Sequence, residues 1–271
     1  SGLFLVYRYQ CSIIYLARFP EGSRQEVDKP SKYQLPFEEV WLRTKDGVRL
    51  HAYLITRDSD TETSQATTLF YCHANAGNMG HRLPIAETIY RQCGCNVFML
   101  SYRGYGLSEG QANEAGIRID TQTALDFIRQ HPLVKDTRIV MFGQSIGGAV
   151  AIDLAARNED QIHAIMLENT FLNLPAIIPH VMPFLASVTF LCHQHWPSDE
   201  LIGKLRRMPI LFLASERDEL VPPSHMTQLY DLTNTNAPVV WRSFPEGTHN
   251  DACLQPGYFE AIAGFWRDHI V

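Results

Sequence analysis

Short, continuous apolar runs recur along the chain, and most are separated by segments with the apolar spacing of helices. A short apolar run is typical of a strand that is buried on both faces of a sheet. Alternation of strands and helices predicts an α/β fold, with a mostly parallel central sheet and helices on both of its faces. The predicted strands are residues 68–72, 97–102, 138–142, 164–167, 210–214 and 239–244.

An antiparallel hairpin is expected before the first of these runs. Residues 39–44 and 48–55 both have the composition of strands, and they flank the dipeptide Asp46-Gly47. Asp-Gly between two such segments is a strong signal for a tight turn between paired strands. The sheet should therefore begin with an antiparallel pair.

The alternation is interrupted between Leu167 and Ile210. This interval is long and rich in apolar side chains, and it is broken by Pro175, Pro179, Pro183 and Pro197. Its length predicts an insertion into the α/β unit at about residues 171–205.

The N-terminal residues 3–16 are apolar and aromatic, but they include Arg8. The run is shorter than the roughly 20 residues that a membrane span requires. Two interpretations stay open: it is the interfacial end of a longer span, or it is a helix lying on the folded domain. We predict that residues 1–20 form a membrane-proximal helical segment and that residues 21–271 form the domain.

The composition excludes two broad classes. Hydrophobic residues make up 45% and charged residues 19% of the chain, which excludes a disordered protein. The net charge of −6 offers no basic surface to a nucleic acid, so we predict no nucleic-acid partner. The six cysteines form no CxxC pair, so we predict no disulfide scaffold. The segment 192–195 holds Cys and His without a second ligand cluster, so we predict no metal, and no cofactor.

The strongest chemical signal is Gly143-Gln144-Ser145-Ile146-Gly147, which stands between a predicted strand and a helical pattern. This context is the one that a nucleophile elbow requires. The two glycines allow a turn too sharp for side chains, and the turn exposes the Ser145 hydroxyl at the start of the helix. Ser145 is therefore the candidate nucleophile, and the backbone N–H of Ile146 is one candidate oxyanion donor.

A serine nucleophile needs a base, and the base needs an acid to orient it. In hydrolases with this elbow the acid and then the histidine follow the serine along the chain. Asp218 follows the predicted strand 210–214, with Glu216 and Glu219 as competing carboxylates. His249 follows the last predicted strand. We predict Asp218 as the acid and His249 as the base.

The second oxyanion donor should follow an early strand. Residues 73–78 come directly after the predicted strand 68–72, and we assign the donor to the backbone N–H of Asn75. The alternative is an ordinary turn of small residues between strand and helix, in which His73 has only a structural role.

Together these motifs resemble the α/β-hydrolase superfamily, and within it the fungal Bem-type (bud-emergence suppressor) branch of membrane-anchored serine hydrolases. The segment 19–24 is similar as well, so the resemblance covers nearly the whole chain. The motifs that carry it are His73-Ala74-Asn75-Ala76-Gly77-Asn78, Tyr102-Arg103-Gly104-Tyr105-Gly106-Leu107-Ser108-Glu109-Gly110, Gly143-Gln144-Ser145-Ile146-Gly147-Gly148, Arg217-Asp218-Glu219-Leu220-Val221-Pro222-Pro223 and Gly247-Thr248-His249-Asn250-Asp251.

The resemblance implies an α/β-hydrolase fold, an N-terminal anchor, a triad of Ser145, Asp218 and His249, and an oxyanion loop at residues 73–78. The branch usually has Gly after the histidine of that loop, whereas this chain has Ala74. If the backbone needs a positive φ there, the methyl group would tilt the Asn75 N–H and lower the catalytic rate.

The insertion at about 171–205 occupies the position of the superfamily's cap. Its apolar side chains could line an acyl pocket, dip toward a bilayer, or simply pack the cap onto the domain. They are Phe171, Leu172, Leu174, Ile177, Ile178, Val181, Met182, Phe184, Leu185 and Phe190.

The leading hypothesis is a serine carboxylesterase that acts on short to medium acyl chains through an acyl-enzyme on Ser145. An acyl-protein or lipid thioesterase, or a lipase, is the nearest alternative, and a catalytically weak hydrolase-like scaffold is the alternative of another class. The expected partner is a small-molecule or lipid acyl ester. The oligomeric state is open, with a monomer favoured. We expect an intracellular, membrane-associated protein whose anchor lies upstream of residues 1–16 or includes them.

Overall fold

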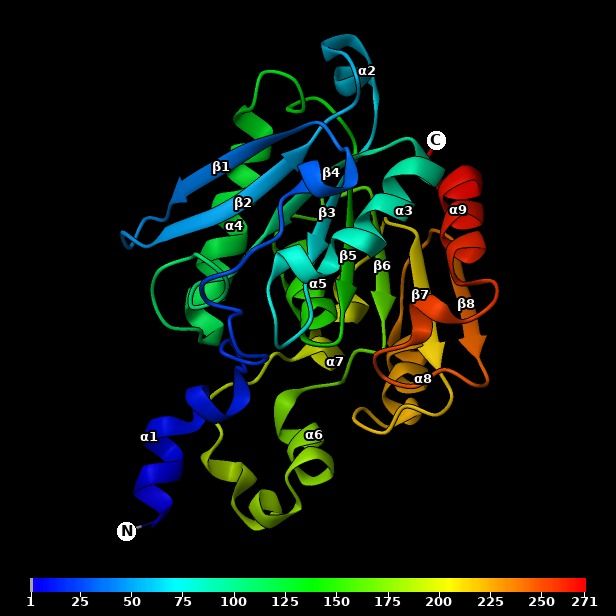
Figure 1. Cartoon of the computed structure of the whole chain (residues 1–271). Helices are drawn as coiled ribbons and strands as arrows, with labels where there is room; N and C mark the ends of the chain where they lie inside the picture. Colours follow the sequence, from blue (N-terminus) through cyan, green and yellow to red (C-terminus); the bar gives the residue numbers. More distant parts are fainter. Residues whose placement is uncertain (1) are drawn as a thin grey trace.

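Eight strands form one sheet in the order β1-β2-β4-β3-β5-β6-β7-β8 in the computed structural model, which describes residues 2–271 (Figure 1). From β3 to β8 every neighbouring pair is parallel, while β2 is antiparallel to both β1 and β4. The strands are β1 Phe37–Arg43, β2 Arg49–Ile55, β3 Thr68–Cys72, β4 Asn96–Leu100, β5 Ile139–Gln144, β6 Ala164–Glu168, β7 Ile210–Ser215 and β8 Val239–Phe244. The mostly parallel sheet and the initial hairpin are therefore confirmed.

All six predicted apolar runs are strands of this sheet, with small differences at their ends. Strand β4 ends at Leu100, two residues earlier than predicted, because the chain turns away from the sheet toward Gly104, whose φ is 83°. Strand β5 extends two residues further, to Gln144, and leads directly into Ser145. Both differences lie at the carboxyl ends of strands, where the candidate site residues are located.

Helices cover both faces of the sheet, as the alternating pattern predicts (Figure 1). Alternate strand residues face opposite layers: Phe70 and Cys72 of β3 belong to one core cluster, and Leu69 and Tyr71 belong to the other. Helices α4 and α5 and the helix α8 pack into the first cluster, and α3 and α9 into the second. The helices are α2 Asp60–Gln65, α3 Leu83–Cys93, α4 Glu114–Gln130, α5 Ile146–Arg157, α8 Pro223–Leu232 and α9 Tyr258–His269, with short 3-10 helices η1 Pro30–Tyr33, η2 Met79–Arg82 and η5 Ala252–Leu254.

The chain between β6 and β7 forms a helical layer beyond the carboxyl ends of the parallel strands (Figure 1). It contains α6 Leu174–Val181, η3 Pro183–Leu191, α7 Ser198–Leu201 and η4 Ile202–Lys204. Asn173 caps α6, since its side chain accepts a hydrogen bond from the N–H of Ala176. We refer to residues 171–205 as the insert.

The N-terminal helix α1, Gly2–Ile14, packs against the insert. The Gln10 side chain accepts a hydrogen bond from the His193 N–H at 2.8 Å and donates one to the Leu191 carbonyl at 3.1 Å. The Tyr15 hydroxyl, just after the helix, donates to Gln194 Oε1 at 2.8 Å. The helix therefore lies on the protein in this structure, which is one of the two interpretations that the sequence left open.

Within residues 2–271, no helix combines the length and the apolarity needed to cross a bilayer.

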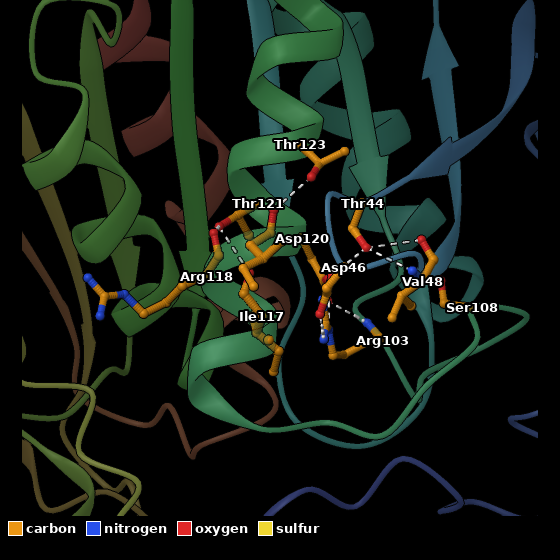
Figure 2. A network of polar contacts seen from close by, with 12 residues as sticks. Thr44, Asp46, Val48, Arg103, Ser108, Ile117, Arg118, Asp120, Thr121 and Thr123 are labelled. Atoms are coloured by element: carbon orange, nitrogen blue, oxygen red, sulfur yellow. Dashed lines mark hydrogen bonds and ion pairs between the residues drawn. The ribbon is translucent and has the colours of Figure 1, made fainter.

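A buried ion-pair network fixes the loop after β4 (Figure 2). The Arg103 guanidinium bonds both Asp46 oxygens, at 2.7 and 3.0 Å, and lies 2.8 Å from Asp120 Oδ1. The Asp120 side chain is fully buried, and this burial raises its pKa, although the hydrogen bonds from Arg103 lower it. A Cβ on Gly116 would lie 2.5 Å from the Arg103 side chain, so glycine leaves room for the arginine. The network joins the β1–β2 turn, α4 and the loop that carries Tyr105.

We expect Arg103→Met to lower the free energy of unfolding by about 3–5 kcal/mol, because it leaves the buried Asp120 without a counter-charge. Urea unfolding measured by circular dichroism tests this. The double variant Arg103→Met/Asp120→Asn should recover part of the loss, since it removes the unpaired charge. A loss below about 1 kcal/mol in the single variant would contradict the structural role of the pair.

Candidate active site

Ser145 lies in a sharp turn between β5 and α5. Its backbone adopts φ 54° and ψ −121°, a conformation that costs free energy for a residue with a side chain. The glycines on either side are required by close backbone contacts: a Cβ on Gly143 would lie 2.2 Å from the Gly147 carbonyl oxygen, and one on Gly147 would lie 2.1 Å from the Cys72 carbonyl oxygen. The turn therefore holds Ser145 at the N-terminus of α5, where the helix dipole favours negative charge.

His249 and Asp218 approach Ser145 from two other loops. His249 Nε2 lies 3.0 Å from Ser145 Oγ, and His249 Nδ1 lies 2.7 Å from Asp218 Oδ2. A carboxylate can only accept, so Nδ1 carries the hydrogen and Nε2 is free to accept the serine proton. Ser145 and Asp218 are each 9% exposed and His249 is 5% exposed, so little water competes for these hydrogen bonds. The structure brings together all three residues that the sequence order selected.

The competing carboxylates occupy different places. Asp218 is buried, and its second oxygen accepts hydrogen bonds from the N–H groups of Leu220 and Val221, at 2.9 and 2.8 Å. Glu219 accepts a hydrogen bond from the backbone N–H of His249 at 3.1 Å, so it holds the histidine loop rather than the imidazole. Glu216 is exposed. Of the three, Asp218 is the carboxylate that contacts the ring.

Asn75 and Ile146 line the same cavity as Ser145. Among the described residues, neither the Asn75 N–H nor the Ile146 N–H donates a hydrogen bond. The Ala74 carbonyl accepts a hydrogen bond from His73 Nδ1 at 2.8 Å, and this fixes the peptide unit that carries the Asn75 N–H, because C=O and N–H point in opposite directions in a trans peptide. Burial lowers the pKa of His73 to about 3, so the ring stays neutral.

The expected difficulty at Ala74 does not arise, because its φ is not positive. The left-handed residues of this loop are Ala76, with φ 64°, and Gly77, with φ 67°. The methyl group of Ala74 is buried and lines the cavity. The condition under which the methyl group was expected to tilt the Asn75 N–H is therefore not met.

A cavity of about 290 Å³ opens in front of Ser145. Its lining is largely apolar and comes from six places: the end of α1 and the residues after it, the oxyanion loop, the turn into α5, the insert, the loop after Asp218, and the histidine loop. The apolar lining residues are Ile14, Leu16, Phe19, Ala74, Ala76, Ile146, Phe171, Leu174, Ile177, Ile178, Val181, Met182, Leu220 and Val221. A larger surface hollow of about 850 Å³ lies between the β1–β2 turn and α4, and none of the three candidate residues lines it.

Two residues that were not predicted from the sequence form hydrogen bonds to the loops that carry the candidate site residues. The Asn169 side chain, directly after β6, donates to the His249 carbonyl at 3.2 Å and accepts from the Ser215 N–H at 2.8 Å. Thr170 Oγ1 donates to the Ser145 carbonyl at 2.7 Å. The available signal was their position at the carboxyl end of a strand, where parallel strands bring loops together.

No three His, Cys, Asp or Glu side chains gather into a possible metal site anywhere in residues 2–271. The cysteines in this part of the chain are all free thiols.

Comparison with known proteins identifies the family of the chain. Residues 67–191 match the family model described as the alpha/beta hydrolase fold. The chain is 47% identical over 269 residues to protein bem46 of Schizosaccharomyces pombe. This alignment covers 99% of this chain and 89% of that protein. It is 37% identical to the uncharacterized membrane protein YNL320W of Saccharomyces cerevisiae, over 96% of this chain and 89% of the relative. The chain belongs to the α/β-hydrolase superfamily, and within it to the group of proteins that includes bem46.

The fold is also similar to that of a solved esterase from Pyrococcus furiosus. The TM-score is 0.75 and the match covers 90% of this chain and 94% of the esterase, with 16% sequence identity. This likeness shows the shared fold, and the α/β-hydrolase fold predicted from the sequence is confirmed.

Proposed function

We propose that the protein is a serine hydrolase that cleaves carboxylic esters, with Ser145 as nucleophile, His249 as base and Asp218 as the residue that orients the base. The observation that carries the proposal is the chain of contacts from Asp218 through His249 to Ser145, 2.7 and 3.0 Å long. Ser145 and His249 line a cavity that Asn75 and Ile146 also line, and in this proposal the backbone N–H groups of Asn75 and Ile146 are the oxyanion donors.

In the first half of the reaction, Ser145 Oγ attacks the ester carbonyl carbon and its proton moves to His249 Nε2. The electron pair of the C=O bond moves onto the oxygen, which accepts hydrogen bonds from the N–H groups of Asn75 and Ile146. When this intermediate collapses, the bond to the leaving alcohol breaks, and the imidazolium gives its proton to that oxygen. The acyl group is then an ester of Ser145.

In the second half, a water molecule attacks the acyl carbon and passes a proton to His249 Nε2. The bond between the acyl carbon and Ser145 Oγ breaks, the imidazolium returns the proton to Oγ, and the carboxylic acid leaves. Asp218 stays ionised throughout and stabilises the imidazolium at each stage.

The cavity supports an apolar acyl group of short to medium length. Its volume of about 290 Å³ lies at the lower end of the range of small-molecule sites. Among the described residues that line the cavity there is no Asp, Glu, Lys or Arg, so a charged acyl group would lose its hydration without gaining a partner. A thioester of the same acyl group would place its carbonyl in the same position, so thioesters belong among the substrates that test the proposal.

We expect Ser145→Ala to lose on the order of 10⁴-fold or more of the hydrolysis of chromogenic esters, because no other group can form the acyl-enzyme. A fluorophosphonate should label the unchanged protein at Ser145, with loss of fluoride, and should not label the variant. Ser224→Ala, which changes an exposed serine of α8, is the matched control. Ester hydrolysis that persists in Ser145→Ala would contradict the assignment of Ser145 as the nucleophile. A wild-type protein that neither reacts with the fluorophosphonate nor hydrolyses esters would favour a hydrolase-like scaffold.

The chain-length preference should depend on the insert. Val181 lines the cavity but is 46% exposed, so Val181→Trp can narrow the pocket without disturbing the core. We expect kcat/KM for an octanoyl ester or thioester to fall about 10-fold or more, while that for an acetyl ester changes less than about twofold. Phe184→Trp, at an exposed position of the insert outside the cavity lining, should change neither. Equal losses on both substrates in Val181→Trp would show that the insert does not select the acyl chain.

We further propose that residues 1–20 contact a membrane together with the insert, which is the cap of a hydrolase domain of residues 21–271. Exposed apolar side chains are concentrated on α1 and on the insert, which pack against each other. They include Phe4, Leu5 and Phe19 of the N-terminal segment and Phe184 and Phe190 of the insert. A relative that covers most of this chain is named a membrane protein.

Sedimentation with phosphatidylcholine vesicles tests this contact. Phe184→Asp/Phe190→Asp should reduce the bound fraction several-fold, because two charges would enter the apolar layer. Leu254→Asp is the matched control, since Leu254 is as exposed as Phe184, at 79%, but belongs to η5. Equal binding of the unchanged protein and the double variant would rule out the insert as a contact surface.

A further inference from the structure

The segment that follows α1 runs along the oxyanion loop and is hydrogen-bonded to it at several points. The Gly77 N–H donates to the Phe19 carbonyl at 2.6 Å. The Asn78 side chain donates to the carbonyls of Ser23 and Glu26, at 2.9 and 2.8 Å. Residues far upstream of the first strand therefore hold the loop that follows β3.

The Asn75 side chain is the link closest to the reacting atoms. Its Nδ2 donates to the carbonyl of Ile14, the last residue of α1, at 2.7 Å, and its Oδ1 accepts from the N–H of Leu16, two residues later, at 2.9 Å. One side-chain amide is therefore hydrogen-bonded to the backbone on either side of the point where α1 ends. The same Oδ1 accepts from the Tyr105 hydroxyl at 2.7 Å and from the Ala76 N–H at 3.0 Å. The side chain of Asn75 thus joins α1, the loop after β4 and the oxyanion loop.

The oxyanion loop needs such support because part of it is strained. Ala76 is left-handed, with φ 64°, and this costs an alanine about 1–2 kcal/mol relative to an ordinary conformation. The Ala76 N–H donates to Asn75 Oδ1, and the Gly77 N–H donates to the Phe19 carbonyl. Without these bonds the loop would relax toward negative φ, and the peptide that carries the Asn75 N–H would turn with it.

His73 and the Asn75 side chain restrain the donor from its two sides. His73 holds the Ala74 carbonyl, at the start of the peptide unit that carries the donor N–H. The Asn75 side chain holds the residue after that N–H, through Ala76 and through α1. His73 is buried against Tyr102, at a ring distance of 4.0 Å, whereas the bonds of Asn75 to Ile14 and Leu16 depend on α1 staying in place.

We propose that the Asn75 side chain is a positioning group for the oxyanion, and that docking of α1 through it is required for the full rate of acyl transfer. The proposal rests on the proposed function, since it concerns the donor that the ester reaction uses. It makes the end of α1, at Ile14 and Leu16, a support of the oxyanion loop. Any force that lifts the end of α1 from Asn75 lowers kcat without touching Ser145, His249 or Asp218.

Asn75→Ala tests the proposal through the division between kcat and KM. Both an acetyl and an octanoyl ester should lose about 10- to 100-fold in kcat, because a misplaced donor stabilises the transition state less, whereas KM should change less than about twofold. Labelling by the fluorophosphonate, whose phosphoryl oxygen occupies the same place, should slow by a similar factor. Thermal unfolding of each variant establishes that the comparison is between folded proteins.

Tyr105→Phe is the milder variant, because it removes one of three donors to Asn75 Oδ1 and leaves no buried group unpaired on the phenyl ring. We expect a severalfold lower kcat. The double variant Asn75→Ala/Tyr105→Phe should be no slower than Asn75→Ala alone, since both changes act through the same amide. If Asn75→Ala does not fold, Tyr105→Phe carries the test. A severalfold lower kcat with KM changed less than about twofold then supports the proposal, and an unchanged kcat overturns it.

Gln10→Ala is the matched control, because the Gln10 side chain is hydrogen-bonded to the insert and, among the described residues, forms no hydrogen bond with the oxyanion loop. It should leave kcat within about twofold. The proposal is overturned if Asn75→Ala keeps its kcat, if it changes only KM for the octanoyl ester, or if Gln10→Ala slows the enzyme equally. An active wild type with an inactive Ser145→Ala and an unchanged Asn75→Ala would reject this inference alone. A wild type without esterase activity would reject both it and the proposed function.

Discussion

The backbone at Ser145 imposes the constraint on which the rest of the site depends. A serine at φ 54° and ψ −121° is unfavourable by itself, and it persists because β5 and α5 are anchored in the core on either side. Gly143 and Gly147 are packed against backbone atoms with no room for a Cβ, so the strand and the helix meet at a contact distance that only glycine allows. The hydroxyl is presented at one place relative to the sheet, and every other group must reach that place.

The other groups reach it from loops at the carboxyl ends of parallel strands. β7 leads to Asp218, β8 leads to His249, and β3 leads to the oxyanion loop. Asparagine side chains connect these loops: Asn169 holds the histidine loop to the end of β7, and Asn75 holds the oxyanion loop to α1. An amide both donates and accepts, so it can join two backbone segments that belong to no common element of secondary structure. The site is therefore assembled by tertiary hydrogen bonds on a scaffold that the sheet provides.

The N-terminal segment and the insert make the apolar side of this site. Both contribute walls to the cavity, and both carry exposed aromatic and aliphatic side chains away from it. On the other side of the loop after β4, Arg103 and its two carboxylates fix the turn that brings Tyr105 to Asn75. The two regions meet at one amide group, that of Asn75, which is hydrogen-bonded both to the end of α1 and to Tyr105.

The order of strands and helices, the hairpin at Asp46-Gly47 and the sharp turn at Ser145 were determined by the sequence alone, because each depends on the periodicity or backbone freedom of adjacent residues. The candidate residues Ser145, Asp218 and His249 could be predicted from their order along the chain. Whether Asp218 or Glu219 contacts the imidazole was decided by the tertiary structure, since both stand on one loop and only their directions differ. The tertiary structure also decided that the left-handed residue is Ala76 rather than Ala74, and that Asn75 bonds Ile14 and Leu16. Local rules reach only a few residues along the chain, whereas these hydrogen bonds join residues that are 30 to 61 positions apart.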